Sequence, residues 1–269
     1  MDFLNTNYIL SKEDKEFYDR EGYLVLKDFL NQSGKELLVE GCKEISNWPE
    51  EKGKWMHYFE KDNETGKRKL CRTENFTPYS STVAQFVSGQ RVSSLLEQVF
   101  NEPYVIFKEK LNYKLPGGNG FPAHQDFTTF THLGQSTHVT VLYAVDKMTV
   151  ANGCLQLVPK SHVLGTLPME EDTTLAKEWC EKQNWVHIEA EVGDVVVFGS
   201  YLAHRSDKNT TNTSRKALYL TYNPAKEGSV HEEYYKSKRE HFPPPIERVE
   251  GKDYSVGAQM YNLATPIEN

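Results

Sequence analysis

The stretch GDVVVFGSYLAHRS, residues 193–206, decides the fold. Three valines and a phenylalanine in succession predict a buried strand, because β-branched and aromatic side chains favour extended, packed backbone. The residues that follow predict a turn, and the turn delivers His204 at the end of this unit. A β-barrel presents ligand-binding side chains at strand ends around its mouth, so His204 is a candidate metal ligand.

Outward from this stretch, apolar residues alternate with a period of two from about Tyr104 onwards, which is typical of strands. Turn residues such as LPGGNG and NPAKEG separate the runs. Strands are predicted over residues 104–113, 122–127, 137–145, 154–158, 185–190, 194–198 and 216–223. Many short strands behind a helical front predict a mainly β fold with flanking helices, a barrel or a double-sheet jelly roll.

The first hundred residues carry helical patterns instead. Ser11 and Asp14 predict a short capped helix that ends at Gly22. After it, the sequence predicts a strand over 23–26 and helices over 34–47 and 92–100.

We expect a single domain over residues 1–269, because no repeat or low-complexity tract divides the chain. Its parts are a helical N-terminal part to about 103, a jelly-roll core over about 104–225, and a tail over 226–269 that wraps the surface. The charged and aromatic segment 49–66 is predicted to be a loop, with a plausible role as a lid.

Charge and composition restrict the partners. Lys and Arg number 31 against 38 Asp and Glu, a net charge of −7, which disfavours nucleic acid or an anionic membrane as a partner. No apolar run is long enough to span a bilayer, and no secretory signal is visible. The four cysteines lie far apart, so we expect a reduced, cytoplasmic protein that acts on a small molecule.

His124 and Asp126 lie two residues apart, in the motif His124-Gln125-Asp126, on a predicted strand. Side chains at i and i+2 share a face and stand about 6.6 Å apart along the backbone, so their tips can converge on one ion. The motif alone is weak, because a surface histidine near an aspartate is common. With His204, two imidazoles and a carboxylate form the facial ligand set of non-haem Fe(II) oxygenases.

Iron bound by three side chains keeps open positions for a 2-oxo acid and O2. The far carboxylate of 2-oxoglutarate then requires a fixed cation inside the barrel, and the fork of an arginine matches a carboxylate better than a lysine does. Arg215 begins an otherwise apolar strand after His204 and is the candidate. The alternative interpretation is an ordinary arginine at a strand end.

Four spaced blocks resemble the phytanoyl-CoA dioxygenase family of Fe(II)/2-oxoglutarate oxygenases: HQD, NGCLQLVPKSH, GDVVVFGSYLAHRS and Arg215. The resemblance extends from GYLVLKDFL to YLTYNPAKEG, which is most of the chain. It implies a double-stranded β-helix, a cupin-like jelly roll. It also implies that His124, Asp126 and His204 bind iron and that Arg215 holds 2-oxoglutarate.

The resemblance assigns further positions. Ser206 and Asn112 match residues that help to hold 2-oxoglutarate in the ectoine-hydroxylase branch, and Arg72 matches a basic residue that faces the co-substrate or substrate. Thr140 is added from strand alternation alone. Phe130 stands where the ectoine branch carries a tryptophan, which argues against ectoine as the substrate.

Asp126 also separates two reactions of the family. Halogenating relatives lack this carboxylate because chloride takes its place on the metal, so its presence implies hydroxylation. The blocks HYFEK, ENF, FKEKLNYKLPGGNGFPAHQD and RKALYLTYNPAKEG look most similar to the 2-aminoethylphosphonate dioxygenases and to relatives that take N-methylated substrates. That resemblance implies hydroxylation of the carbon next to phosphorus in phosphonate breakdown.

One face of the predicted strand 104–113 favours an anionic substrate, because Lys108, Lys110 and Asn112 share it with no acid. This face is an anion receptor, joined by Arg72, if it lines the barrel mouth. On a solvated edge strand the lysines would only protect the edge.

Ring faces that suit an ammonium group are available from Trp55, Tyr58, Phe59, Phe127, Tyr143 and Tyr201, with Glu60 or Glu74 as a counter-charge. The substrate-binding candidates are Lys108, Lys110, Gln125, Tyr58, Phe130 and Tyr201.

Three alternatives stay open at the level of sequence. The same oxygenase chemistry on another small amine, an amino acid or an acyl-CoA is the first. The second is a zinc hydrolase that uses His124, His132 and His138, although their spacing fits no zinc-protease pattern. The third is a non-catalytic jelly-roll binding protein.

Overall fold

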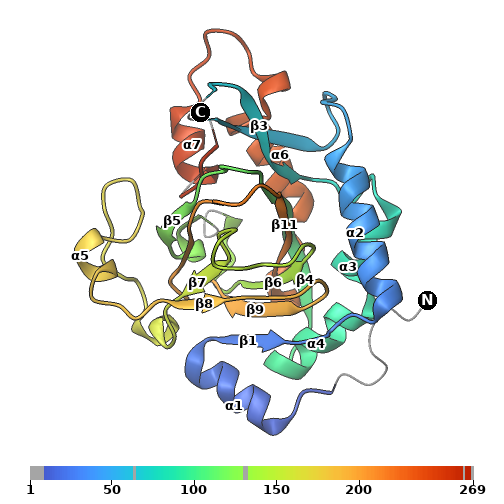
Figure 1. Ribbon diagram of the computed structural model, residues 1–269, viewed down its shortest axis with the longest axis vertical. Helices are drawn as coiled ribbons and strands as arrows, with labels where there is room; N and C mark the ends of the chain where they lie inside the picture. The colour runs from blue at the N-terminus through green and yellow to red at the C-terminus, as the bar shows by residue number, and fades with distance from the viewer. Residues whose placement is uncertain (1–8, 63–64, 130–132, 263, 268–269) are drawn as a thin grey trace.

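Two antiparallel sheets form the centre of the protein (Figure 1), whose computed structural model describes residues 9–62, 65–129, 133–262 and 264–267. The strands are β1 (Tyr23–Leu26), β2 (Met56–Lys61), β3 (Arg68–Glu74), β4 (Tyr104–Lys114), β5 (Phe121–His124), β6 (Val139–Ala144), β7 (Leu155–Leu157), β8 (Val186–Ile188), β9 (Val195–Gly199), β10 (His204–Ser206) and β11 (Arg215–Pro224). The larger sheet has the order β1-β9-β6-β11-β4-β3-β2, and the smaller has the order β5-β10-β7-β8.

The two sheets face each other across an apolar core, which makes the fold the predicted double-stranded β-helix. Strand β9 shows how the sequence builds it, because every second side chain belongs to a different layer. Val196 and Phe198 pack between the sheets, whereas Val195 and Val197 pack on the outer face of the large sheet. A strand buried on both faces therefore appears in the sequence as a continuous apolar run.

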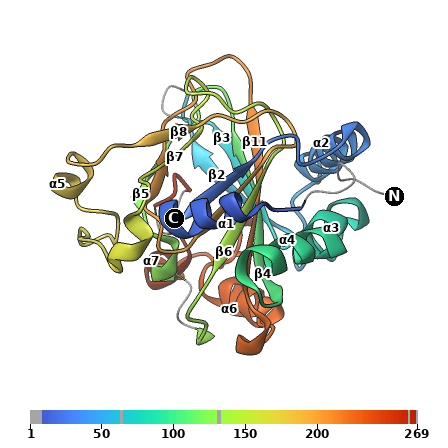
Figure 2. The same cartoon turned by 90° about the horizontal axis from the view of Figure 1, so that it is seen from below.

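Helices cover the large sheet and its end, as the two views show (Figures 1 and 2). The helices are α1 (Lys12–Glu21), α2 (Gln32–Ser46), α3 (Ser81–Ser88), α4 (Gln90–Phe100), α5 (Lys177–Cys180), α6 (His231–His241) and α7 (Ser255–Tyr261). Helices α2, α3 and α4 bury their apolar residues against the outer face of the large sheet. Helices α6 and α7 pack with β2, β3 and β4 around Phe107 and Tyr234. No helix in the described ranges has both the length and the apolar character to cross a membrane.

Local signals in the sequence are confirmed where they are strongest. Helix α1 begins with a capping box in which Ser11 accepts from the backbone N–H of Asp14 and Asp14 accepts from that of Ser11. It ends at Gly22, whose φ of 84° is left-handed, and a β-carbon there would lie 2.3 Å from Nδ1 of His162. The predicted strands of the core are all present, with ends shifted by a few residues.

The structure contradicts one expected element, excludes one alternative and adds helices that were not predicted. The segment 49–66 is not a loop throughout, since it contains β2, which pairs with β3 at the edge of the large sheet. Strand β4 is not a solvated edge, because β11 and β3 flank it. The tail after residue 225 contains the helices α6 and α7. In the N-terminal part, helix α3 was not predicted. These helices are set by packing against the sheet rather than by a clear local period.

A buried ion pair ties α6 to the sheet. Nε2 of His231 lies 2.6 Å from Oε2 of Glu109, and the Tyr235 hydroxyl donates to the Glu109 carbonyl at 2.7 Å. Burial lowers the pKa of His231, but the hydrogen bond and the charge of Glu109 outweigh burial and raise it above 6.5. The protonated imidazole is therefore the form that folding favours.

We expect His231→Gln to destabilise the protein by about 1 kcal/mol, or roughly 2–4 °C in Tm, at acidic pH. The stabilisation is complete below the unfolded pKa of 6.5 and is lost as the pH rises through the raised folded-state pKa. Thermal unfolding of both proteins across this range measures the effect, with the exposed His241→Gln on the same helix as the control. A stability difference that grows with pH would contradict the ion pair.

Candidate active site

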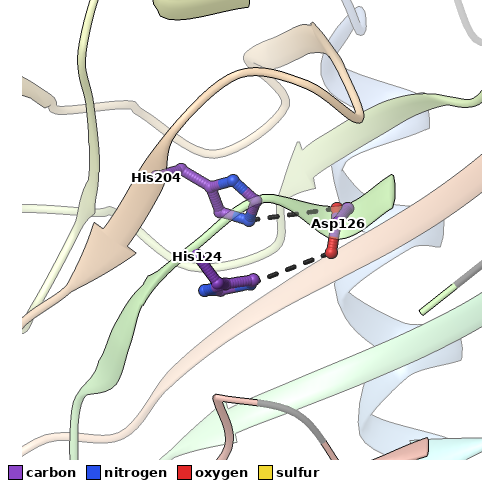
Figure 3. Close-up of side chains that lie close together, drawn as sticks. All are labelled: His124, Asp126 and His204. Carbon is purple, nitrogen blue, oxygen red and sulfur yellow. Dashed lines mark ion pairs between the residues drawn. The ribbon is translucent and has the colours of Figure 1, made fainter. Parts of the chain in front are cut away.

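His124, Asp126 and His204 meet at one end of the space between the sheets. His124 ends β5 and His204 begins β10, and the two are direct cross-strand partners with ring centroids 4.1 Å apart. Asp126 opens the turn that follows β5. Nε2 of His124 lies 3.8 Å from Oδ1 of Asp126, and Nε2 of His204 lies 3.9 Å from Oδ2 (Figure 3). The three ligand atoms lie within 4.8 Å of one another.

Hydrogen bonds orient both imidazoles in the same way. Nδ1 of His124 lies 2.7 Å from the Pro122 carbonyl, and Nδ1 of His204 lies 2.9 Å from the Leu202 carbonyl. A carbonyl only accepts, so each Nδ1 carries the hydrogen and each Nε2 keeps its lone pair. Partners of this kind fix the tautomer of metal-binding histidines. Both lone pairs therefore face Asp126, where an ion would bind.

The three groups also have the charge states that metal binding requires. Burial, followed by the neighbouring His204, lowers the pKa of His124 to about 3, and burial lowers the pKa of His204. Burial alone would raise the pKa of Asp126, but Lys110, the two histidines and Lys108 together outweigh burial and hold the pKa well below its usual range. Two neutral imidazoles and one carboxylate form a facial set that fits Fe(II).

The structure does not support the ligand set of the zinc-hydrolase alternative. Of its three histidines only His124 belongs to the cluster, which is the only group of this type in the described parts of the chain. The ring of His138 packs against Phe107 with centroids 4.6 Å apart. His132 lies outside the described residues.

The predicted binding residues for 2-oxoglutarate lie on neighbouring strands. On β4, Asn112 lies two residues from the end, and Arg215 begins β11 directly opposite Lys114. The guanidinium of Arg215 is 2% exposed and donates to the Gly153 carbonyl, while its Nε hydrogen has no acceptor among the described residues. A buried, unpaired donor fits a carboxylate ligand at this position.

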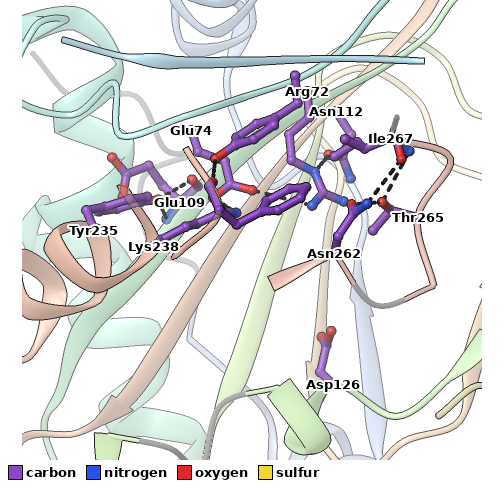
Figure 4. Close-up of polar contacts among 12 residues, drawn as sticks. Arg72, Glu74, Glu109, Asn112, Asp126, Tyr235, Lys238, Asn262, Thr265 and Ile267 are labelled. Carbon is purple, nitrogen blue, oxygen red and sulfur yellow. Dashed lines mark hydrogen bonds and ion pairs between the residues drawn. The ribbon is translucent and has the colours of Figure 1, made fainter. Parts of the chain in front are cut away.

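Arg72, Thr140 and Ser206 have defined partners. Nε of Arg72 donates to Oδ1 of Asn112 at 2.9 Å, so the two candidates orient each other (Figure 4). The Thr140 hydroxyl is buried and lies 3.2 Å from the hydroxyl of Thr221. Ser206 accepts a hydrogen bond from Lys114 at 2.8 Å.

A small cavity of about 30 Å³ adjoins the metal cluster. Three cations line it, and all three are buried: Arg72, Lys108 and Lys110. Burial lowers the pKa of Lys108 and of Lys110. The remaining lining residues are His124, Asp126, Phe121, Tyr261 and Thr265. The predicted anion-receptor face therefore does point toward the cluster, and the buried lysines exclude the interpretation as solvated edge residues.

Other predicted substrate residues lie away from this cavity. Gln125 is a structural clamp, since its amide donates to the carbonyls of Gly165 and Tyr201 and accepts from the N–H of Leu167. The Tyr201 ring stacks on Phe127 at 4.3 Å between centroids. Neither Gln125 nor Tyr201 lines the cavity. Phe130 lies outside the described residues.

Tyr58 belongs to an aromatic cage that the protein fills with its own ammonium. Nζ of Lys238 on α6 lies 4.9 Å from the Tyr58 ring, 5.9 Å from Tyr261 and 6.0 Å from Tyr234. It also lies 2.6 Å from Oε2 of Glu74, an ion pair visible in Figure 4. Tyr58 and Glu74 are therefore occupied, and the prediction that they bind a substrate ammonium is wrong.

Sequence reasoning missed the residues that close the cavity from the C-terminal side. Tyr261 and Thr265 come from α7 and the segment after it, and Thr265 also lines a larger cleft of about 520 Å³. Asn262 holds this segment, accepting from the Thr265 hydroxyl and donating to the Ile267 carbonyl (Figure 4). No spacing links these residues to the barrel motifs.

The chain is similar to known oxygenases. The family model described as phytanoyl-CoA dioxygenase (PhyH) matches residues 18–217. A 2-aminoethylphosphonate dioxygenase from uncultured bacterium HF130_AEPn_1 is 41% identical over 258 residues, covering 96% of this chain and 98% of that protein. A methylphosphonate hydroxylase from Gimesia maris is 36% identical, covering 89% of this chain and 90% of that protein.

Solved structures agree on the fold. EctD from S. alaskensis with 2-oxoglutarate and 5-hydroxyectoine matches with a TM-score of 0.68 and 19% identity, covering 84% of this chain and 81% of that one. The epimerase SnoN in complex with Fe3+ and α-ketoglutarate matches with a TM-score of 0.66 and 18% identity, covering 80% and 83%. Together with the His-Asp-His cluster, these findings identify the chain as a member of the phytanoyl-CoA dioxygenase family, a dioxygenase that uses iron, 2-oxoglutarate and O2.

Proposed function

We propose that the enzyme hydroxylates a small phosphonate, 2-aminoethylphosphonate or an N-methylated form of it, at the carbon next to phosphorus. The observation that carries this proposal is the buried group of Arg72, Lys108 and Lys110 beside Asp126. The two phosphonate-oxidising relatives support it, because both align over most of the chain.

The charges around the cavity favour a dianion. Glu74 pairs with both Lys238 and Arg72, and Lys108 and Lys110 lie beside Asp126, so four cations here are matched by two carboxylates. When Fe(II) and 2-oxoglutarate are bound, the two positive charges of the metal and the two negative charges of the co-substrate cancel. The remaining excess is positive, and a phosphonate group supplies the matching negative charge with oxygens for several charge-assisted hydrogen bonds.

In the reaction, the chain's own residues bind the substrate and exclude water. Bound iron with 2-oxoglutarate and O2 supplies the oxidising chemistry, in which one oxygen atom enters a substrate C–H bond and the other enters succinate as CO2 leaves. Lys108, Lys110 and Arg72 hold the phosphonate next to the metal cluster, which brings the adjacent carbon closest to it. Tyr261 and Thr265 close the cavity against solvent. Because the cavity holds only about 30 Å³, this cover must move to admit the substrate.

Methylphosphonate is the second candidate. The aromatic cage is occupied by Lys238, and Glu74 is paired with it, so this cage offers no place for a substrate ammonium. A substrate without an amine would need only the cation group. The similarity to a methylphosphonate hydroxylase supports this alternative.

Succinate formation by the purified enzyme with Fe(II), ascorbate and 2-oxoglutarate tests the proposal. We expect 2-aminoethylphosphonate, its trimethyl form or methylphosphonate to raise succinate release about tenfold or more. Taurine is the matched control, because it replaces the phosphonate by a sulfonate of lower charge and should give little stimulation. Stimulation by taurine equal to that by the phosphonates would contradict the dianion receptor, and no stimulation by any phosphonate would remove the substrate proposal.

We also propose that the enzyme works in the cytoplasm, without a nucleic-acid or membrane partner. The cysteines at 42, 71, 154 and 180 are all free, which suits a reducing compartment. The net charge of −7 gives no attraction to nucleic acid or anionic lipid. Recovery of the enzyme from the secreted or membrane fraction of its cell would contradict this location.

A further inference from the structure

Lys114 is the last residue of β4, and its side chain lies deep in the barrel. Only 1% of it is exposed. Its Nζ donates to Oγ of Ser206 at 2.8 Å, to the Gly153 carbonyl at 3.2 Å and to the Asp207 carbonyl. Sequence reasoning gave Lys114 no role.

Lys114 and Arg215 form a pair of buried cations. They are direct cross-strand partners, and both donate to the carbonyl of Gly153. Neither makes a salt bridge with a carboxylate of the described residues: Asp207 accepts from Gln156 instead, and the Glu60 carboxylate accepts from the backbone and side chain of Asn119. Burial, followed by the charge of Arg215, lowers the pKa of Lys114 to about 6. Asp207 and Glu60 raise this pKa only partly, so no carboxylate of the described residues neutralises the two cations by direct contact.

The surrounding sequence keeps space for the ammonium group. Gly153 has a φ of 73°, and a β-carbon there would lie 2.8 Å from Nζ of Lys114 and 2.2 Å from the Asp207 carbonyl oxygen. Only glycine combines this backbone conformation with this close approach.

Ser206 is oriented by the same contact. Because its oxygen accepts from Lys114, its single hydrogen must point elsewhere. The Nε hydrogen of Arg215 also has no acceptor in the described parts of the chain. The Ser206 hydroxyl and Nε of Arg215 can therefore donate to a bound anion at this end of the barrel, beside the positive charges of Lys114 and Arg215.

We propose that Lys114 is a positioning residue that completes, with Arg215, a two-cation receptor for the far carboxylate of 2-oxoglutarate. Lys114 orients the Ser206 hydroxyl as a donor to that carboxylate. It also supplies the second positive charge, because a bound carboxylate raises the pKa of the ammonium that burial and Arg215 lower in its absence. The receptor selects 2-oxo acids that carry a second carboxylate over those of equal length that lack it. The inference concerns the co-substrate, so it holds whether or not the substrate is a phosphonate.

Equilibrium binding to the anaerobic Fe(II) enzyme tests this role by calorimetry, with two ligands of the same chain length. We expect Lys114→Met to weaken 2-oxoglutarate binding about tenfold or more, and to leave 2-oxopentanoate, which lacks the far carboxylate, within about twofold. The exposed Lys43→Met on α2 is the control and should change neither affinity. An unchanged affinity for 2-oxoglutarate, or an equal loss for both acids, would overturn the proposal.

A second substitution keeps the test decisive if Lys114→Met does not fold. Lys114→Gln removes the charge but keeps a polar side chain, and it should also weaken 2-oxoglutarate selectively. Ser206→Ala removes the hydroxyl that Lys114 orients, so it should also weaken 2-oxoglutarate and not 2-oxopentanoate. When both variants fold, the double variant should lose less than the sum of the two single losses, because the residues act through one contact. Selective loss in Ser206→Ala supports the receptor, and equal loss for both acids argues against it.

Discussion

Asp126→Asn is expected to lower phosphonate-stimulated succinate formation by about 1000-fold or more. Replacing a residue that only hydrogen-bonds to a metal ligand already lowers metal affinity or activity about 10–100-fold, and Asp126 is itself the anionic member of the cluster. Asparagine has almost the same shape, so the change removes charge and leaves the cavity size unaltered. The remaining pair of neutral imidazoles faces Lys108 and Lys110, which repel a cation once the carboxylate is gone.

Two measurements separate the loss of metal from a loss of folding. Anaerobic titration should show weakened Fe(II) binding in Asp126→Asn, and circular dichroism should show an intact fold. Asp19→Asn, on the exposed surface of α1, is the control and should retain full activity. Normal iron binding with normal succinate formation in Asp126→Asn would exclude this cluster as the metal site.

Lys110→Met is expected to raise the KM for the phosphonate about 100-fold, which corresponds to about 3 kcal/mol for a buried charge-assisted contact. Binding of 2-oxoglutarate should remain unchanged, because Lys110 lines the cavity beside Asp126, whereas Lys114 and Arg215 meet at the end of β4 and are not among the residues that line this cavity. The variant should be at least as stable as the parent, since burial and the charge of Arg72 disfavour the charged form of Lys110 despite the opposing charge of Asp126.

Steady-state kinetics with varied phosphonate, and calorimetry with 2-oxoglutarate, check both parts of this prediction. Lys61→Met is the matched control, because Lys61 ends β2 with its side chain exposed. A Lys110→Met enzyme with an unchanged KM would mean that the anion is held elsewhere. An equal loss of 2-oxoglutarate affinity would assign Lys110 to the co-substrate instead.

The metal cluster could be predicted from the sequence because its information is local. His124 and Asp126 share a face by the period of a strand, and His204 follows an unmistakable buried strand. The cation face of β4 was found in the same way. Alternation placed Lys108 and Lys110 on one side, although it could not say whether that side met solvent or the barrel interior.

The aromatic receptor was mispredicted for the opposite reason, because it depends on contacts between distant elements. Tyr58 lies on an edge strand that looked like a loop, and Lys238 lies on a helix in what looked like a surface tail. No local pattern in either segment predicts that the ammonium group of Lys238 on α6 lies in the aromatic cage. Local patterns predict which face of a strand or helix is buried and where the element ends. Packing between distant elements determines which helix covers which sheet.

The cover formed by Tyr261 and Thr265 has a practical consequence. Both residues follow all eleven strands in chain order, so the cover is not part of the barrel itself. Proteolytic cleavage after β11 would leave both histidines and the aspartate in place but would remove the cover and admit water to the site. We expect the cleaved enzyme to convert 2-oxoglutarate to succinate without hydroxylating the substrate.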